Sequence, residues 1–172
     1  MLGRPFLRIA TLALFVGLVS PQAALAAPAA AIPACPLLTI PEVTAALGVP
    51  VEAVEQEPSG GGEGEGRMTT CLWTPVGGRL GSTLSLVVWS WPPGDYGAAG
   101  FLEALRAYAK EDPDRPVETL PVGDDALWDG DRVYVRKGDV NFTLATSLNA
   151  LDPTPDARRK LEALAGLVAE RL

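Results

Sequence analysis

The stretch "CLWTPVGGRLGSTLSLVVWS", residues 71–90, carries the strongest indication of the fold expected for this chain. Residues 71–75 and 82–91 are rich in β-forming side chains, and the glycines at 77–78 supply a turn between them, which predicts two neighbouring strands. A second stretch at 126–146, "ALWDGDRVYVRKGDVNFTLAT", also contains a Leu-Trp pair, a turn and a long alternating strand. Each stretch follows a predicted helix and a short strand containing Val-Glu. This echo predicts a duplicated α-β-β-β unit.

The other segments continue the succession of helices and strands. Apolar side chains at helical spacing predict a helix over 95–112 with Asp95 as its N-cap, and a last helix that begins near Pro155. Further strands are predicted at 51–57, 117–121, 126–128, 132–136 and 139–148. Antiparallel hairpins separated by helices predict an α+β domain, in which a mixed or antiparallel sheet is covered by helices.

The segment after Cys35 carries the signals of a short helix. Thr39 is placed as the N-cap and Glu42 follows three residues later, which is the pattern of a capping box. Pro41 falls in the first turn, where its missing N–H costs no hydrogen bond. Gly48 can adopt the left-handed conformation that ends a helix, so the helix is predicted to end at Leu47.

Residues 1–26 have the features of an export signal peptide. Arg4 and Arg8 give a positive start, residues 9–19 are apolar, and Ala-Leu-Ala at 24–26 fits a cleavage site. The apolar run is too short to cross a bilayer comfortably, and no later run approaches the required length. We therefore expect an exported protein, periplasmic or extracellular, with no transmembrane segment in the mature chain.

The mature chain is expected to form one acidic domain. Residues 27–34 are predicted as a flexible segment and residues 35–172 as a single domain, which the glycine-rich loop at 59–66 interrupts. The 172 residues include 14 basic and 21 acidic side chains, for a net charge of −7, and the predicted signal contains no acid. Repulsion therefore argues against nucleic acid and anionic membrane surfaces as partners.

Cys35 and Cys71 are the only two cysteines. In an oxidising compartment such a pair predicts a disulfide, which would join the region of the first helix to the strand at 71–75. Attachment of a lipid to Cys35 is an alternative, but Pro33 interrupts the required motif and the site lies well beyond the apolar run, so we expect no lipid anchor. A reactive thiol is the third alternative, and it would lack a histidine as its base.

The residue types present exclude several kinds of chemistry. The absence of histidine excludes Ser-His-Asp and Cys-His catalysis and the common zinc sites. The acidic stretch at 123–131 fails as an EF-hand loop, because the third position from Asp125 is Leu127 and the twelfth is Arg136. It favours a hairpin turn at Asp129-Gly130 instead. We expect no metal, no cofactor and no catalytic residue, although a pair of carboxylates would suffice for a small hydrolase.

One segment, "VVWSWPPGDYG" at 87–97, indicates a binding surface. Strand alternation places Trp89 and Trp91 on the face opposite to the expected core, and Tyr96 follows the Pro-Pro turn. If this face is open, the three rings form an aromatic platform for a sugar, a peptide or a protein partner. The alternative is that a helix covers the face.

Several motifs resemble one group of proteins. "CPLLTIPEVTAALGVPV" at 35–51, Cys-x-Trp at 71–73, "PVGDDALW" at 121–128 and "VRKGDVNFTL" at 135–144 are together similar to exported, often lipid-anchored bacterial proteins of unknown function. The resemblance spans most of the mature chain and implies a PsbP-like α/β sandwich, with no catalytic residue to carry over. We expect a non-enzymatic envelope or secreted module that binds a protein or small ligand. The alternatives are a small carboxylate hydrolase and a purely structural domain.

Overall fold

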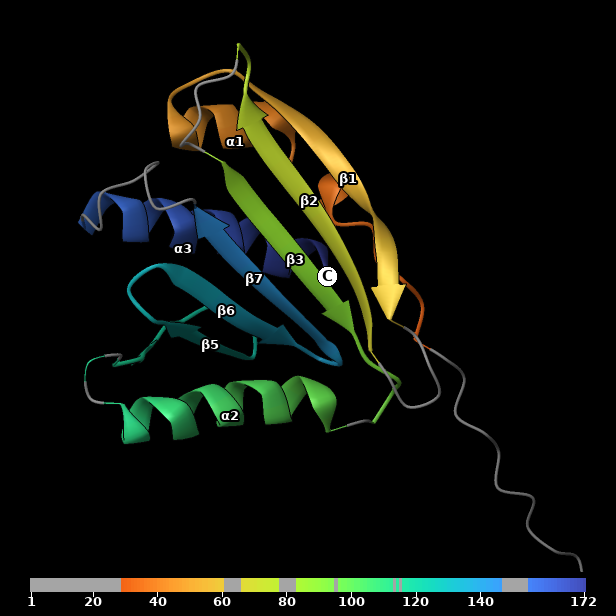
Figure 1. Cartoon of the computed structure of the whole chain (residues 1–172), viewed down its shortest axis with the longest axis vertical. Coiled ribbons are helices and arrows are strands. Elements are labelled where there is room, and N and C mark those ends of the chain that lie inside the picture. The colour runs from red at the N-terminus through yellow and green to blue at the C-terminus, as the bar shows by residue number, and fades with distance from the viewer. Residues whose placement is uncertain are drawn as a thin grey trace, which may run out of the picture.

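A computed structural model describes residues 29–60, 66–77, 83–94, 96–112, 114, 116–146 and 155–172. The predictions of an export signal at 1–26 and of a loop at 61–65 lie outside these residues. The described chain forms one seven-stranded antiparallel sheet with helices packed on it (Figure 1). The predicted α+β class is therefore confirmed.

The order of elements agrees closely with the sequence-based prediction. The helices are the short 3₁₀ helix η1 (Cys35–Leu37), α1 (Ile40–Leu47), α2 (Gly97–Glu111) and α3 (Pro155–Arg171). The strands are β1 (Val51–Gly60), β2 (Arg67–Pro75), β3 (Leu84–Ser90), β4 (Glu118–Thr119), β5 (Asp125–Trp128), β6 (Arg132–Lys137) and β7 (Val140–Thr146).

Two antiparallel meanders meet at the centre of the sheet. The strand order is β1-β2-β3-β7-β6-β5-β4, and the meanders join where β3 pairs with β7, from Leu84 opposite Thr146 to Ser90 opposite Val140. The first meander has three strands and the second has four. Both halves of the sheet are therefore antiparallel meanders, but they differ in their number of strands.

One face of the sheet is closed by α1 and α3. Leu84, Leu86 and Val88 of β3 are at most 1% exposed and point to this face, as strand alternation predicted. They belong to one core cluster with Val43 of α1 and Val168 of α3. Burial of this apolar surface is the main source of the domain's stability.

The opposite face is covered over only part of its width, by α2. Leu102 of α2 packs with Leu127 of β5 and Tyr134 of β6 in a second, smaller cluster. Figure 1 shows α2 along the bottom of the molecule next to β5 and β6, whereas β1 and β2 lie at the other edge of the sheet. The side chain of Val54 on β1 is 55% exposed. This uncovered half of the sheet determines where a ligand can approach.

The first helix forms as predicted from its local sequence. The Thr39 hydroxyl accepts a hydrogen bond from the Glu42 N–H at 3.4 Å, and Glu42 Oε2 accepts one from the Thr39 N–H at 2.8 Å. Gly48 ends the helix in the left-handed region with φ of 74°. These contacts complete the capping box.

Several predicted boundaries need correction, and β2 also begins at Arg67, before the predicted start at Cys71. The N-cap of α2 is Tyr96, without a side-chain cap bond, whereas the predicted cap Asp95 lies outside the described residues. β1 continues through Ser59 to Gly60, where the sequence predicted a loop, because Gly60 still pairs with Arg67. Tertiary pairing thus overrides the weak strand propensity of glycine. The strand predicted at 117–121 is reduced to the two residues of β4.

The predicted disulfide between Cys35 and Cys71 is present, with the two Cα atoms 4.9 Å apart. Its sulfurs are bonded to each other, so neither cysteine is a free thiol. Residues before Cys35 also contact the sheet. The hydroxyls of Thr69 and Ser90 donate to the carbonyls of Ile32 and Ala30 at 2.5 and 2.6 Å.

No helix in the described part of the chain is long and apolar enough to cross a membrane.

Candidate ligand-binding groove

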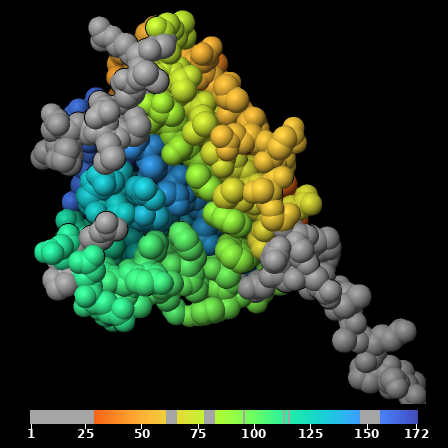
Figure 2. Space-filling model, viewed as in Figure 1, coloured from red at the N-terminus to blue at the C-terminus, as the bar shows by residue number. Residues whose placement is uncertain are grey.

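A groove of about 1150 Å³ lies between the C-terminal half of α2 and the uncovered part of the sheet. In Figure 2, atoms of β6 and β7, in cyan and blue, remain visible between α2 and the yellow-green strands. The lining residues come from segments far apart in the chain. They include Leu72, Ser85, Leu105, Tyr108, Ala109, Glu111, Asp112, Asp114, Val117, Asp129, Asp131, Arg132, Tyr134 and Ala145.

Strand register explains the floor of the groove. Leu72, Ser85, Ala145 and Arg132 are consecutive partners across β2, β3, β7 and β6. Side chains at paired positions project from the same face of a sheet, so this row faces the groove. Ser85 and Ala145 are small. A ligand can therefore approach the backbone at the centre of the sheet.

Tyr134 and Asp129 fix the end of the groove beside the β5–β6 turn. The Tyr134 hydroxyl donates to Asp129 Oδ2 at 2.7 Å, while Asp129 Oδ1 accepts from the N–H groups of Asp131 and Arg132 at 3.0 and 2.8 Å. Burial, reinforced by the bond to Asp129, raises the pKa of Tyr134 to about 12. The phenol is therefore neutral at physiological pH, and the Asp129 carboxylate serves to hold the turn.

An ion pair and an aromatic contact hold α2 as the opposite wall. Arg106 donates two hydrogen bonds to the carboxylate of Asp125, at 2.9 and 2.5 Å. The guanidinium lowers the pKa of Asp125, so the carboxylate stays charged. Phe101 packs beside Tyr134 with ring centroids 6.1 Å apart. These contacts fix the helix over β5 and β6 and keep the groove open beside it.

The groove combines apolar walls with an acidic rim. Five of its lining residues are acids, against the single cation Arg132. Glu111, Asp114 and Asp131 are exposed. Leu105, Ala109, Val117 and Leu72 supply apolar surface between these charges. Such a lining suits a ligand that is both apolar and positively charged.

The predicted platform residues Trp89 and Trp91 lie together, but outside the lining of the groove. Their rings are stacked with centroids 6.0 Å apart, and both are partly buried. The Trp91 indole N–H donates to Asn141 Oδ1 at 2.9 Å. A Cβ placed on Gly97 would lie 2.2 Å from Trp91 Cε3, so the first turn of α2 rests directly on this ring. Trp91 therefore supports α2.

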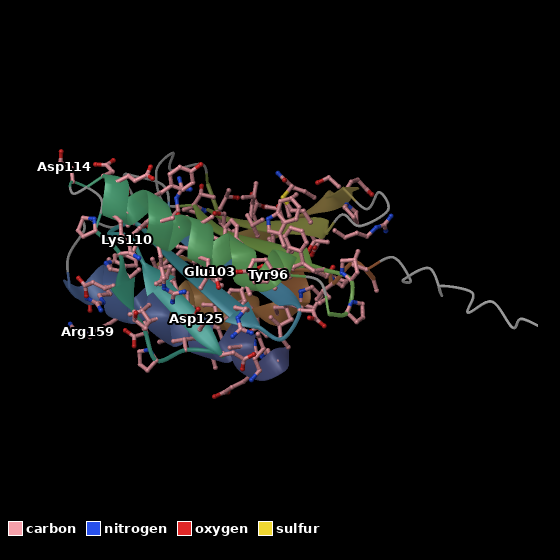
Figure 3. All side chains as sticks on the ribbon, turned by 90° about the horizontal axis from the view of Figure 1, so that it is seen from below. Tyr96, Glu103, Lys110, Asp114, Asp125 and Arg159 are labelled. Atoms are coloured by element: carbon pink, nitrogen blue, oxygen red, sulfur yellow. A yellow bond between two sulfur atoms is a disulfide. The ribbon has the colours of Figure 1, made fainter. Side chains whose placement is uncertain are left out.

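Tyr96, the third predicted platform residue, is 62% exposed. Its hydroxyl donates to the carboxylate of Glu103, and this bond raises the pKa of Tyr96. Figure 3 shows the two side chains next to each other along α2. Among the described residues, no ring contact joins Tyr96 to either tryptophan. Binding by Trp89, Trp91 or Tyr96 stays a prediction.

One further cluster of side chains has a structural explanation. Oxygen or sulfur atoms of Cys35, Cys71 and Glu55 lie within 4.8 Å of one another, a spacing that would suit a metal ion. Both sulfurs, however, are consumed by the disulfide. The Glu55 carboxylate accepts hydrogen bonds from the N–H groups of Ala34 and Cys35, at 2.7 and 2.6 Å. It thereby anchors the start of η1 to β1.

Sequence reasoning did not find the groove, because its walls come from elements whose relative placement has no local signal. The stretch with Asp129 and Asp131 predicts only a turn, and the turn is present. The sequence signal that pointed to this region was the group of acidic residues near Glu111 and Asp114, after the end of a predicted helix.

Comparison with protein-family models, curated proteins and solved structures gives no match.

Proposed function

We propose that this chain is a non-enzymatic, exported binding module of the cell envelope or exterior, whose ligand or partner occupies the groove beside α2. The groove's size and mixed lining are the observation that carries the proposal. Sites that bind ligands are typically concave and mostly apolar, with a few polar groups that set orientation. The Cys35–Cys71 disulfide supports an oxidising location. We also propose that the domain is a PsbP-like sandwich built from a duplicated α-β-β-β unit.

The electrostatic state of the carboxyl groups favours binding over hydrolysis. A carboxylate-dependent hydrolase requires one carboxylic acid with a raised pKa, so that it can donate a proton near neutral pH. In the described part of the chain, the carboxyl groups with a shifted pKa are Glu42, Asp124, Asp125 and Asp156, and all four shifts are downward. Hydrogen bonds and nearby cations cause these shifts. All four groups remain ionised, and Glu42 and Asp125 join different elements through Arg171 and Arg106.

The uncovered half-sheet also favours binding over a purely structural role. A domain without a ligand gains stability by burying apolar side chains, yet Leu72 and Leu105 border an open space. Tyr108, at 70% exposure, lies at the same site. Exposed apolar surface gathered in one concavity is typical of an interaction site.

A fragment screen with a matched pair of variants tests the proposal. Small aromatic and aliphatic compounds would be added to isotope-labelled protein, and amide chemical shifts would be recorded. We expect shifts at β3, β7 and α2 in the wild type. Ala109→Trp should abolish them, because Ala109 lines the groove, whereas Ala107→Trp adds the same ring to the exposed surface of the same helix.

Two results would contradict the proposal. Compounds that shift only residues around Trp89 would move the site to the other end of α2. Compounds that bind Ala109→Trp as well as they bind the wild type would show that the groove is not used. Circular dichroism of both variants would verify that the helix content is preserved.

A further inference from the structure

We infer that the occupant of the groove is an extended, basic and amphipathic segment of a partner protein. This inference rests on the proposed function and specifies the class of partner. The inference is based on the apolar walls of the groove, the distribution of charge at its rim, and its size.

The negative charge is concentrated at one end of the groove. Glu111, Asp112 and Asp114 lie at and beyond the C-terminus of α2, and Asp129 and Asp131 lie at the β5–β6 turn opposite. Figure 3 shows Asp114 beyond the end of α2, far from Tyr96. The C-terminus of a helix carries partial negative charge from its unpaired carbonyls, which adds to this field. A cationic side chain is therefore favoured at this end.

The apolar lining of the groove comes from both α2 and the sheet. Leu105, Tyr108 and Ala109 line it from α2, and Leu72 and Ala145 line it from the sheet. An extended peptide sends alternate side chains to opposite sides, so apolar residues can meet these walls while basic residues reach the acidic end of the groove. Alternating apolar and basic residues are the simplest sequence that satisfies both requirements.

Charge argues against other occupants. A groove of about 1150 Å³ is large enough to hold a chain segment. A second copy of this protein, with a net charge of −7, would be repelled by the acidic rim. Nucleic acids and anionic lipid surfaces would be repelled for the same reason.

The test uses a labelled peptide of about eight residues that alternates leucine and lysine, which spans roughly 27 Å when extended. Its affinity for the full mature chain would be measured by fluorescence anisotropy at about 20 mM and about 200 mM salt, where screening differs strongly. We expect saturable binding that weakens with salt. A leucine–glutamate peptide and a serine–lysine peptide should both bind at least about tenfold more weakly, because each lacks one of the two features.

Charge-matched variants locate the binding site. The triple variant Glu111→Gln, Asp114→Asn, Asp131→Asn should weaken binding of the leucine–lysine peptide by about tenfold, from the loss of three exposed charge pairs. The control triple variant Glu52→Gln, Glu57→Gln, Glu162→Gln removes the same charge outside the groove lining and should change affinity less than about twofold. Equal weakening by both variants would overturn the inference, since it would reveal only long-range attraction to an acidic protein.

The outcomes also separate this inference from the proposed function. If neutral fragments bind at the groove while the leucine–lysine peptide does not, the class of partner is wrong and the binding function stands. If the peptide binds Ala109→Trp as tightly as the wild type, the groove is not its site and the inference fails. If neither fragments nor peptide bind at the groove, both proposals fail.

Discussion

Arg106 on α2 and Asp125 at the start of β5 are joined by two hydrogen bonds between guanidinium and carboxylate, at 2.9 and 2.5 Å. The pair lies next to the small cluster that includes Leu102 and Tyr134. It is therefore a direct tie between the helix that forms one wall of the groove and the sheet that forms its floor. The Leu102 cluster, the Phe101–Tyr134 contact and the packing of Gly97 against Trp91 also hold this wall.

Replacing Arg106 with Gln should lower the free energy of unfolding by about 1 kcal/mol, because the pair is charge-assisted but partly solvent-exposed. Asp125 has a lowered pKa in the folded state, so its contribution is present above the unfolded pKa and is lost as pH falls through the folded pKa. Urea unfolding at pH 7 and at pH 3 should therefore show a smaller difference between variant and wild type at the lower pH. Arg159→Gln, which removes a more exposed ion pair, is the control and should have little effect. An equal loss in both variants would contradict the role given to Arg106.

The Glu42 carboxylate should make stability depend on acid pH. Hydrogen bonds from Arg171 and Thr39 lower its pKa from 4.5 to about 2. Its contribution is complete above pH 4.5 and declines as pH falls toward 2. Glu42→Gln should reduce stability at pH 7 and flatten the pH dependence between these limits, measured by urea unfolding. Glu162→Gln is the control for general charge, and an identical pH profile in both variants would disprove the prediction.

Removing the disulfide should destabilise the domain without changing its fold. The Cys35→Ser, Cys71→Ser variant opens a loop with a sequence separation of 36 residues, and loop entropy gives a cost of about 4 kcal/mol. Chemical unfolding of the oxidised wild type and the double variant measures this difference. The mass of the unreduced mature protein should show no free thiol. A diacylglyceryl group on Cys35, with Cys71 reduced, would refute the pairing in the exported protein.

Trp91 and Trp89 should differ in their effect on stability. Trp91→Phe removes the indole donor and leaves the oxygen of the buried Asn141 side chain without that partner, which should cost about 1–3 kcal/mol. Trp89→Phe retains a stacked ring and should cost less. Thermal unfolding compares the two variants. Neither should alter peptide affinity if the groove is the binding site, whereas a selective loss of affinity in Trp89→Phe would favour the aromatic platform.

Two helical glycines provide a test of how α2 is seated. Gly97→Ala should destabilise the protein, since the new Cβ would lie 2.2 Å from Trp91 Cε3. Gly166→Ala on α3 meets no atom within 4 Å and should stabilise the protein by about 0.5–1 kcal/mol through helix propensity. Opposite shifts in melting temperature are expected. A neutral Gly97→Ala would mean that Trp91 moves aside freely.

Local sequence signals predicted a large part of the fold because they act over a few residues. The capping box at Thr39 and Glu42 and the left-handed Gly48 need only neighbouring atoms, and both are present. Alternation in β3 assigned Leu84, Leu86 and Val88 to the core face without any knowledge of the partner strands. The Cys35–Cys71 disulfide followed from the number of cysteines and the expected compartment.

Long-range contacts settled what these signals left open. An amphipathic pattern indicates that α2 buries one side, but only packing of Leu102 on Leu127 and Tyr134 selects which strands it covers. The pairing of β3 with β7 brings Ser85 and Ala145 together across 60 residues of chain. The groove exists because that pairing widens the sheet beyond the reach of one helix. Its acids come from two separate segments that tertiary packing brings to one groove, and no periodicity along the chain encodes that placement.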